Sequence, residues 1–212
     1  MLLQENIKKE VRKQFQNLKK PVRIIVFTQK MECQFCKDTH SLMEELAELS
    51  DKISIEVYDF IDNTDKAKEY GIDKIPGVVI AGEKDFGIKF YGIPGGYEFT
   101  SLIEAVTSVS MGEADLENDT RTFLDSLTED IHLQVFVTPT CPYCPRAVIL
   151  AHHMALYSDK VKADMVEVTE FPHLGNKYQV QGVPRTVINE TEFAEGAVPE
   201  GMMVEKIKAA MS

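Results

Sequence analysis

The sequence is short of positive charge and has no long apolar run. Its 23 lysines and arginines stand against 34 aspartates and glutamates, which gives a formal net charge of −11. Nucleic acids and anionic membrane surfaces bind cationic faces, so we expect no nucleic-acid partner and no membrane partner. Spanning a bilayer takes about 20 consecutive apolar residues, and no segment comes near that length. The 44% hydrophobic content instead predicts a globular protein.

The first residues also lack the features of a secretory signal. The stretch MLLQENIKKEVRKQF carries charges early and often, without an apolar core or a small-residue cleavage site. We therefore predict a cytoplasmic protein, and stable structural disulfides are uncommon in that compartment. Cysteine is scarce, with four residues, and tryptophan is absent. Four cysteines in such a chain indicate metal binding or redox chemistry.

The four cysteines form two CxxC pairs. Cys33 and Cys36 enclose the motif CQFC, and Cys141 and Cys144 enclose CPYC. A zinc ribbon usually spaces two such pairs by about 15–20 residues, whereas these pairs are separated by most of a domain. We therefore predict no metal site, although structural zinc and an iron–sulfur cluster remain the alternative uses for four cysteines.

Other residues repeat at the spacing of the two motifs. Pro76 and Pro184 have the same separation as the CxxC pairs, and so do Asp59 and Glu167. The segments around the two prolines, YGIDKIPGVVI and YQVQGVPRTVI, also match. Three features at one spacing predict two copies of one unit of about 100 residues, which is far longer than a solenoid repeat.

Each copy shows the same order of elements. An opening helix leads to a buried strand, at 22–27 or 132–137, and the CxxC follows as the start of a second helix. Another strand, a short helix, the repeated proline, a third strand and a last helix complete the copy. This alternation predicts an α/β fold, a mixed central sheet with helices on both faces. We place the two units at residues 1–112 and 113–212.

A cysteine at the start of a helix has a chemical use. The thiolate is the nucleophile in disulfide exchange, and the partial positive charge of a helix N-terminus stabilises this anion. We predict that Cys33 and Cys141 lie exposed at a helix cap, with Cys36 and Cys144 one turn further in. The first cysteine would then attack a partner disulfide, and the second would resolve the mixed disulfide.

These motifs resemble a known family. CPYC is the motif of glutaredoxins, and the order CxxC, helix, strand, helix, proline, strand is similar to the thioredoxin fold. Two such units in tandem, with the run IKFYGIPGGYEF at 88–99, resemble the glutaredoxin-like protein disulfide oxidoreductases of thermophilic bacteria and archaea. The resemblance covers essentially the whole chain, and it implies a thermophilic source and two thioredoxin-like units.

The resemblance also implies roles for residues outside the motifs. Pro76 and Pro184 would be cis-prolines that face the active sites. Ile75 and Val183, which precede them, would offer backbone groups to an extended partner chain. Many relatives have threonine at these two positions, so the substrate details differ here.

Asp59 and Glu167 are candidates for proton transfer to the second thiol of each pair. Each lies late in a strand next to the one that leads to the CxxC. The alternative interpretation of both residues is a solvated or structural carboxylate.

The function that follows is thiol–disulfide exchange: an enzyme that reduces, forms or isomerises protein disulfides. It needs no bound cofactor, because the cysteines carry the electrons. The resemblance implies a thioredoxin-reductase-like flavoprotein as electron donor and peroxiredoxins among the protein clients. The alternatives are a redox-switched, chaperone-like binding module, a glutathione-dependent glutaredoxin, and a metal-storage or scaffold protein.

The two sites are not identical in sequence. Copy one has Gln34 and Phe35 where copy two has Pro142 and Tyr143, and two more residues separate its strand from its first cysteine. Because CPYC matches glutaredoxins more closely, our hypothesis is that the second site is the stronger general exchanger.

Overall fold

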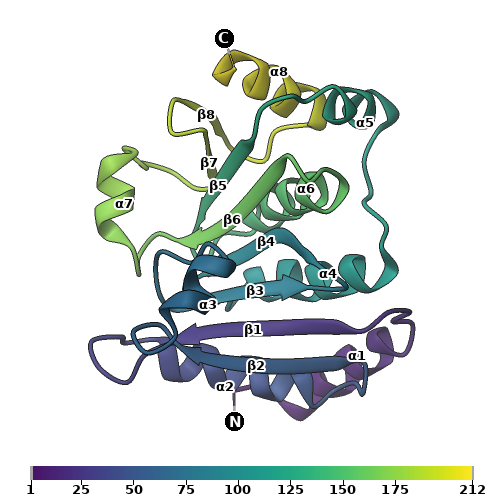
Figure 1. Cartoon of the computed structure of the whole chain (residues 1–212), viewed down its shortest axis with the longest axis vertical. Helices are drawn as coiled ribbons and strands as arrows, with labels where there is room; N and C mark the ends of the chain where they lie inside the picture. The colour runs from purple at the N-terminus through teal and green to yellow at the C-terminus, as the bar shows by residue number, and fades with distance from the viewer. Residues whose placement is uncertain (1, 212) are drawn as a thin grey trace.

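The computed structural model describes residues 2–211, in which eight strands form one continuous sheet (Figure 1). The elements in chain order are α1 (Glu5–Phe15), β1 (Val22–Thr28), α2 (Cys36–Ala47), β2 (Ile53–Asp59), α3 (Thr64–Glu69), β3 (Gly77–Ala81), β4 (Asp85–Tyr91), α4 (Glu98–Met111), α5 (Asn118–Asp125), β5 (Ile131–Val137), α6 (Cys144–Tyr157), β6 (Val161–Glu167), α7 (Pro172–Lys177), β7 (Arg185–Ile188), β8 (Glu192–Glu195) and α8 (Glu200–Ala210). Within these residues no helix is both long and apolar enough to cross a membrane. The predicted α/β class is confirmed.

The sheet contains the same four-strand pattern twice. Its order is β2-β1-β3-β4 followed by β6-β5-β7-β8. In each half the first two strands are parallel, and the third and fourth pair antiparallel. Strands β1, β2, β4, β5, β6 and β8 therefore all run in one direction. As a result, the carboxyl ends of β1 and β5, where the two CxxC motifs follow, lie at the same edge of the sheet.

The two halves join where β4 pairs in parallel with β6. The register places Ile88 beside Ala163 and Phe90 beside Met165. We call this β4–β6 joint the seam. The sequence predicted three strands in each copy and missed β4 and β8. In β4, Gly87 has a left-handed φ of 77° and interrupts the apolar pattern, and β8 is only four residues long.

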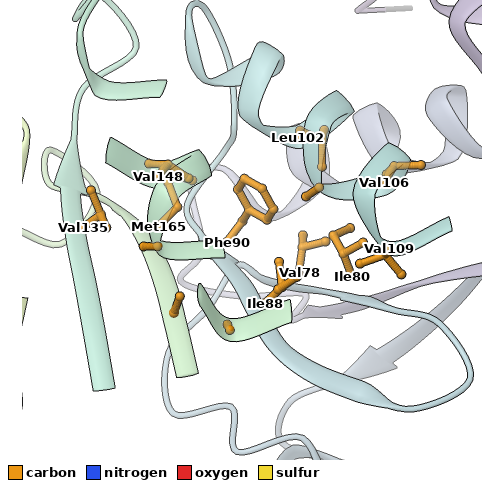
Figure 2. Close-up of a cluster of buried hydrophobic side chains, with 14 of the residues drawn as sticks. Val78, Ile80, Ile88, Phe90, Leu102, Val106, Val109, Val135, Val148 and Met165 are labelled. Carbon is orange, nitrogen blue, oxygen red and sulfur yellow. The ribbon is translucent and has the colours of Figure 1, made fainter. Parts of the chain in front are cut away.

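One apolar core crosses the seam on the face that carries α2, α4 and α6. It is continuous from α1 to α8, and α4 packs directly on α6. Figure 2 shows Phe90 of β4 between Leu102 of α4 and Val148 of α6. A second, smaller cluster lies under α3 and α7 on the opposite face. Helices therefore cover both faces, and the burial of the near-continuous apolar strands β1 and β5 is explained.

The connection between the halves runs from α4 to α5. Helix α4 ends at Met111, and Gly112 closes it in the left-handed conformation, with φ of 69°. The predicted division between residues 112 and 113 falls in this connection.

Candidate active site

Both CxxC motifs form disulfides. The Sγ–Sγ distance is 1.98 Å for Cys33–Cys36 and 2.20 Å for Cys141–Cys144, and the Cα atoms are 5.4 and 5.5 Å apart. Within residues 2–211 no three histidine, cysteine or acidic residues gather as a ligand set for a metal. The spacing of the motif is therefore used here for a bond within each pair.

Each disulfide lies at the start of a helix, although two residues later in the motif than predicted. Helix α2 begins at Cys36 and α6 at Cys144, with Phe35 and Tyr143 as the cap residues. The first cysteine of each pair lies in the turn before the cap. Its sulfur nevertheless lies close to the helix N-terminus, because it is bonded to the sulfur of a first-turn residue. The unpaired N–H groups there favour an anion.

The first cysteines differ in exposure. Cys33 is partly exposed, as predicted, whereas Cys141 is buried, with 7% of its surface exposed. The Cys141 Sγ lies 3.7 Å from the carbonyl oxygen of Val183, so the prediction of an exposed Cys141 is wrong. The second cysteines are buried as predicted, with Cys36 at 2% and Cys144 at 0%. Burial protects the resolving thiol in both sites from direct attack.

The structure places the repeated prolines as the sequence predicted. The Ile75–Pro76 and Val183–Pro184 peptide bonds are both cis. Ile75 and Val183 are each partly exposed. The contact between Val183 and Cys141 shows that the residue before the proline borders the second disulfide.

The carboxylates of Asp59 and Glu167 are held by the turns that follow their strands. Asp59 Oδ1 accepts hydrogen bonds from the amides of Ile61 and Asp62 at 3.0 and 3.1 Å. Glu167 is buried, and its Oε2 accepts from Thr169 Oγ1 at 2.6 Å. These bonds give both carboxylates a local structural role, and proton transfer stays a prediction.

Two buried acids that the sequence analysis missed lie near the seam. Glu98 begins α4 and is 1% exposed, and burial raises its pKa to about 7. Burial also raises the pKa of Glu170 to about 7, and the charge of Glu167 adds to this effect. Glu170 Oε1 accepts a hydrogen bond from the Ile93 amide at 2.7 Å. No local pattern marks these residues, because the chain that buries them is distant in sequence.

A buried histidine also lies at the seam. His152 of α6 is 2% exposed, and its ring meets that of Phe90 of β4 edge-on, with the centroids 4.8 Å apart. Burial lowers the pKa of His152 to about 4. The imidazole is therefore neutral at pH 7 and packs as part of the core.

A family model agrees with this geometry. The model for the thioredoxin domain matches twice, over residues 22–104 and 131–209. Each match contains one CxxC, its helix and one cis-proline.

Solved structures with the same fold cover nearly the whole chain. The protein disulfide oxidoreductase from Aeropyrum pernix K1 is 31% identical and superposes with a TM-score of 0.92, covering 99% of this chain and 94% of that one. The NTD_N/C domain of the alkylhydroperoxide reductase AhpF from Enterococcus faecalis is 28% identical, with a TM-score of 0.89 and coverage of 97% and 99%. Both likenesses extend across the two halves and the seam.

Curated relatives are longer proteins. An NADH dehydrogenase of Bacillus subtilis is 26% identical over 211 residues, which is 100% of this chain and 38% of the relative. The alkyl hydroperoxide reductase component AhpF of Pseudomonas aeruginosa is 24% identical over 208 residues, or 98% of this chain and 37% of the relative. The chain therefore spans less than two fifths of these two relatives.

Proposed function

The chain belongs to the thioredoxin domain family and is a thiol–disulfide oxidoreductase with two CxxC sites, and on this basis we propose how the sites work. The observation that carries the proposal is a bonded cysteine pair at the N-terminal end of a helix in each unit. We assign the units to residues 1–112 and 113–212.

The reaction is a two-step exchange in which Cys33, Cys36, Cys141 and Cys144 are the catalytic residues. In the reduced second site, the Cys141 thiolate attacks one sulfur of a client disulfide and releases the other client sulfur as a thiolate. Cys144 then loses its proton and attacks the Cys141 sulfur, which releases the second client sulfur. Two electrons pass to the client, and the site is left oxidised. The same steps in reverse oxidise a client dithiol.

Client polypeptides dock in an extended conformation beside the cis-prolines. Ile75 and Pro76 serve the first site, and Val183 and Pro184 serve the second. The contact between the Val183 carbonyl and the Cys141 sulfur supports this assignment, because a client sulfur that approaches Cys141 brings its own backbone to the same residue. Pairing of an added strand with backbone groups is tolerant of sequence, which suits an enzyme with many clients.

The oxidised sites are recharged by another protein. Relatives named as alkyl hydroperoxide reductase components and a structural neighbour from AhpF support a place in a peroxide-reducing chain. We propose that a thioredoxin-reductase-like flavoprotein supplies the electrons and that peroxiredoxins are among the clients. We also propose a cytoplasmic location, in a thermophilic source.

Insulin reduction with dithiothreitol as reductant tests the proposal. The wild type should turn over, and Cys33→Ser and Cys141→Ser should each remove one site. Cys141→Ser should cost more turnover than Cys33→Ser, because the CPYC site is the stronger exchanger. Equal losses, or a larger loss in Cys33→Ser, would reject this ranking.

The same assay separates the alternative functions. A redox-switched, chaperone-like module would hold unfolded clients without reducing insulin. A glutathione-dependent glutaredoxin would reduce a small mixed disulfide with glutathione and would need only the first cysteine of a site. Full activity in the Cys36→Ser, Cys144→Ser double variant would therefore contradict the two-cysteine mechanism.

A further inference from the structure

The turn between β4 and α4 of the first unit lies against the second redox site. We call residues 92–97 the bridging turn. The amide of Tyr97 donates a hydrogen bond to the carbonyl oxygen of Pro139 at 3.0 Å, and Pro139 lies two residues before Cys141. The amide of Ile93 donates to Glu170 Oε1 at 2.7 Å. Both ends of the bridging turn are therefore bonded to the second unit.

Gly96 makes a close approach in this contact. Its φ is +59°, and a side chain there would overlap the Pro139 carbonyl oxygen and lie 2.9 Å from the carbonyl carbon. These are backbone atoms, which cannot move aside as a flexible side chain can. The amide of Cys141 in turn donates to the carbonyl oxygen of Thr138 at 3.2 Å. Contact with the bridging turn therefore reaches Cys141 through one short loop.

The second unit has an equivalent turn without this contact. Gly92 donates its amide hydrogen bond to the Pro76 carbonyl at 3.0 Å, and Gly196 does so to Pro184 at 2.8 Å. Gly196 also has a positive φ, +77°, but a side chain there would meet nothing within 4 Å. The topology explains the difference, because β4 lies at the seam and β8 lies at the edge of the sheet.

We propose that the bridging turn of the first unit is a positioning element of the second redox site. It holds the 138–141 loop so that the Cys141 sulfur lies against the N-terminal end of α6. In the reduced enzyme no disulfide ties Cys141 to Cys144, so this support decides whether the thiol stays near the helix terminus. Within residues 2–211, no backbone hydrogen bond joins the second unit to the loop before Cys33. The inference rests on the proposed function, because it assumes that the Cys141–Cys144 pair cycles between dithiol and disulfide.

Gly96→Ala tests the proposal, with Gly196→Ala as the matched control. Both changes place a side chain at a left-handed position in equivalent turns, so they share the conformational cost and differ in the clash with Pro139. The readout is the pH profile of alkylation of each cysteine in the fully reduced protein, resolved by mass spectrometry. In Gly96→Ala we expect the midpoint for Cys141 to move to higher pH, with a roughly ten-fold loss of thiolate at a given pH, while Cys33 keeps its wild-type profile. Gly196→Ala should leave both profiles unchanged.

Two outcomes would overturn the proposal. One is a wild-type Cys141 profile in Gly96→Ala, and the other is an equal displacement of the Cys33 and Cys141 profiles. If Gly96→Ala does not fold, Glu170→Ala carries the same test, because it removes the acceptor of the Ile93 amide and leaves the backbone of the turn unstrained. A failure of the proposed function has a different signature: the wild-type Cys141–Cys144 pair would not reduce insulin, whatever the bridging turn does.

Discussion

Glu98 is a carboxyl group that folding places in apolar surroundings. Burial raises its pKa from 4.5 to about 7, and the hydroxyl of Ser101, which donates a hydrogen bond to it, offsets only part of this rise. The folded state therefore binds a proton that the unfolded state loses near pH 4.5. The favourable contribution of this group is complete below pH 4.5 and is lost as the pH rises through about 7.

We predict that Glu98→Gln stabilises the protein in alkaline but not in acidic solution. The glutamine keeps the shape and stays neutral, so it avoids a cost of up to about 3 kcal/mol that the ionised carboxylate has above pH 7. Urea unfolding at pH 5 and pH 8 measures the difference between the variant and the wild type. Comparison of the two proteins at each pH removes the parallel contribution of Glu170. The same difference at both pH values would contradict the prediction.

At this scale the sequence predicted residues whose chemistry is local. The cysteine pairs and the prolines were found because a fixed spacing marks them wherever the chain folds. The environments of Glu98, Glu170 and His152 could not be predicted, because each depends on segments that are distant in the sequence. The exposure of Cys141 was predicted wrongly for the same reason, since Val183 lies against it.

The first turns of α2 and α6 differ in charge near their disulfides. Lys37 and Asp38 lie in the first turn of α2, whereas the corresponding turn of α6 has Arg146 and no acidic residue. An acid at this position is favourable for the helix itself, but it opposes a thiolate at the same terminus, whereas a cation supports one. This difference favours the second site as the stronger exchanger.

We predict that removing these charges changes the two sites in opposite directions. Asp38→Asn should speed alkylation of Cys33 by about two- to five-fold at neutral pH and low salt, because each such charge contributes about 0.3–1 kcal/mol near a helix end. Arg146→Gln should slow alkylation of Cys141 by a similar factor. Each variant serves as the control for the other, since it leaves the distant site unchanged. Both effects should shrink in about 1 M salt, and effects that persist there would show a cause other than charge.

At the scale of elements, predictability followed the strength of the apolar pattern. Strands β1 and β5 were predicted almost to the residue, because both faces of each are covered and nearly every side chain is apolar. Strands β4 and β8 were missed, and β8 has only one of its four side chains buried. The start of α2 and α6 was placed too early in the motif, since the turn before the cap has no pattern of its own.

The molecule as a whole is stabilised by what crosses the seam. His152 from the second unit packs its neutral ring on Phe90 from the first. Burial lowers the pKa of His152 from 6.5 to about 4. The unfolded chain gains a proton near pH 6.5 and the folded chain does not, so the contribution of this residue is complete above pH 6.5. It is lost as the pH falls through about 4.

We predict that acid destabilises the seam through His152. Between pH 6.5 and 4 the wild type should lose up to about 3 kcal/mol from this group, and His152→Leu should not. Thermal unfolding at pH 7 and pH 4 measures the effect, and a lower stability of the variant at pH 7 leaves the test intact. An unchanged difference between the two proteins across this range would show that the histidine is already protonated or hydrated in the folded state.

The repeat in the sequence predicted two units, but it contained no signal for the joint between them. Which strand of one unit meets which strand of the other depends on the edges that the folded units present. Here Phe90 and Met165 lie side by side in the seam, and their sequence neighbours look like those of any core strand. The single sheet, and the bridging turn that it brings to the second site, are therefore visible only in the structure.

The seam is a head-to-tail joint, and this has a consequence for how copies of the chain meet. It joins an outer strand of one unit to an outer strand of the next, which leaves β2 and β8 as the outer strands of the whole sheet. These free edges are the counterparts of β6 and β4, so the same joint could in principle continue from one molecule to another as an open filament. Strand β8 is short and bounded by Glu192 and Glu195, and β2 carries Glu56 and Asp59. Two acidic edges repel each other, and this opposes the addition of a further copy.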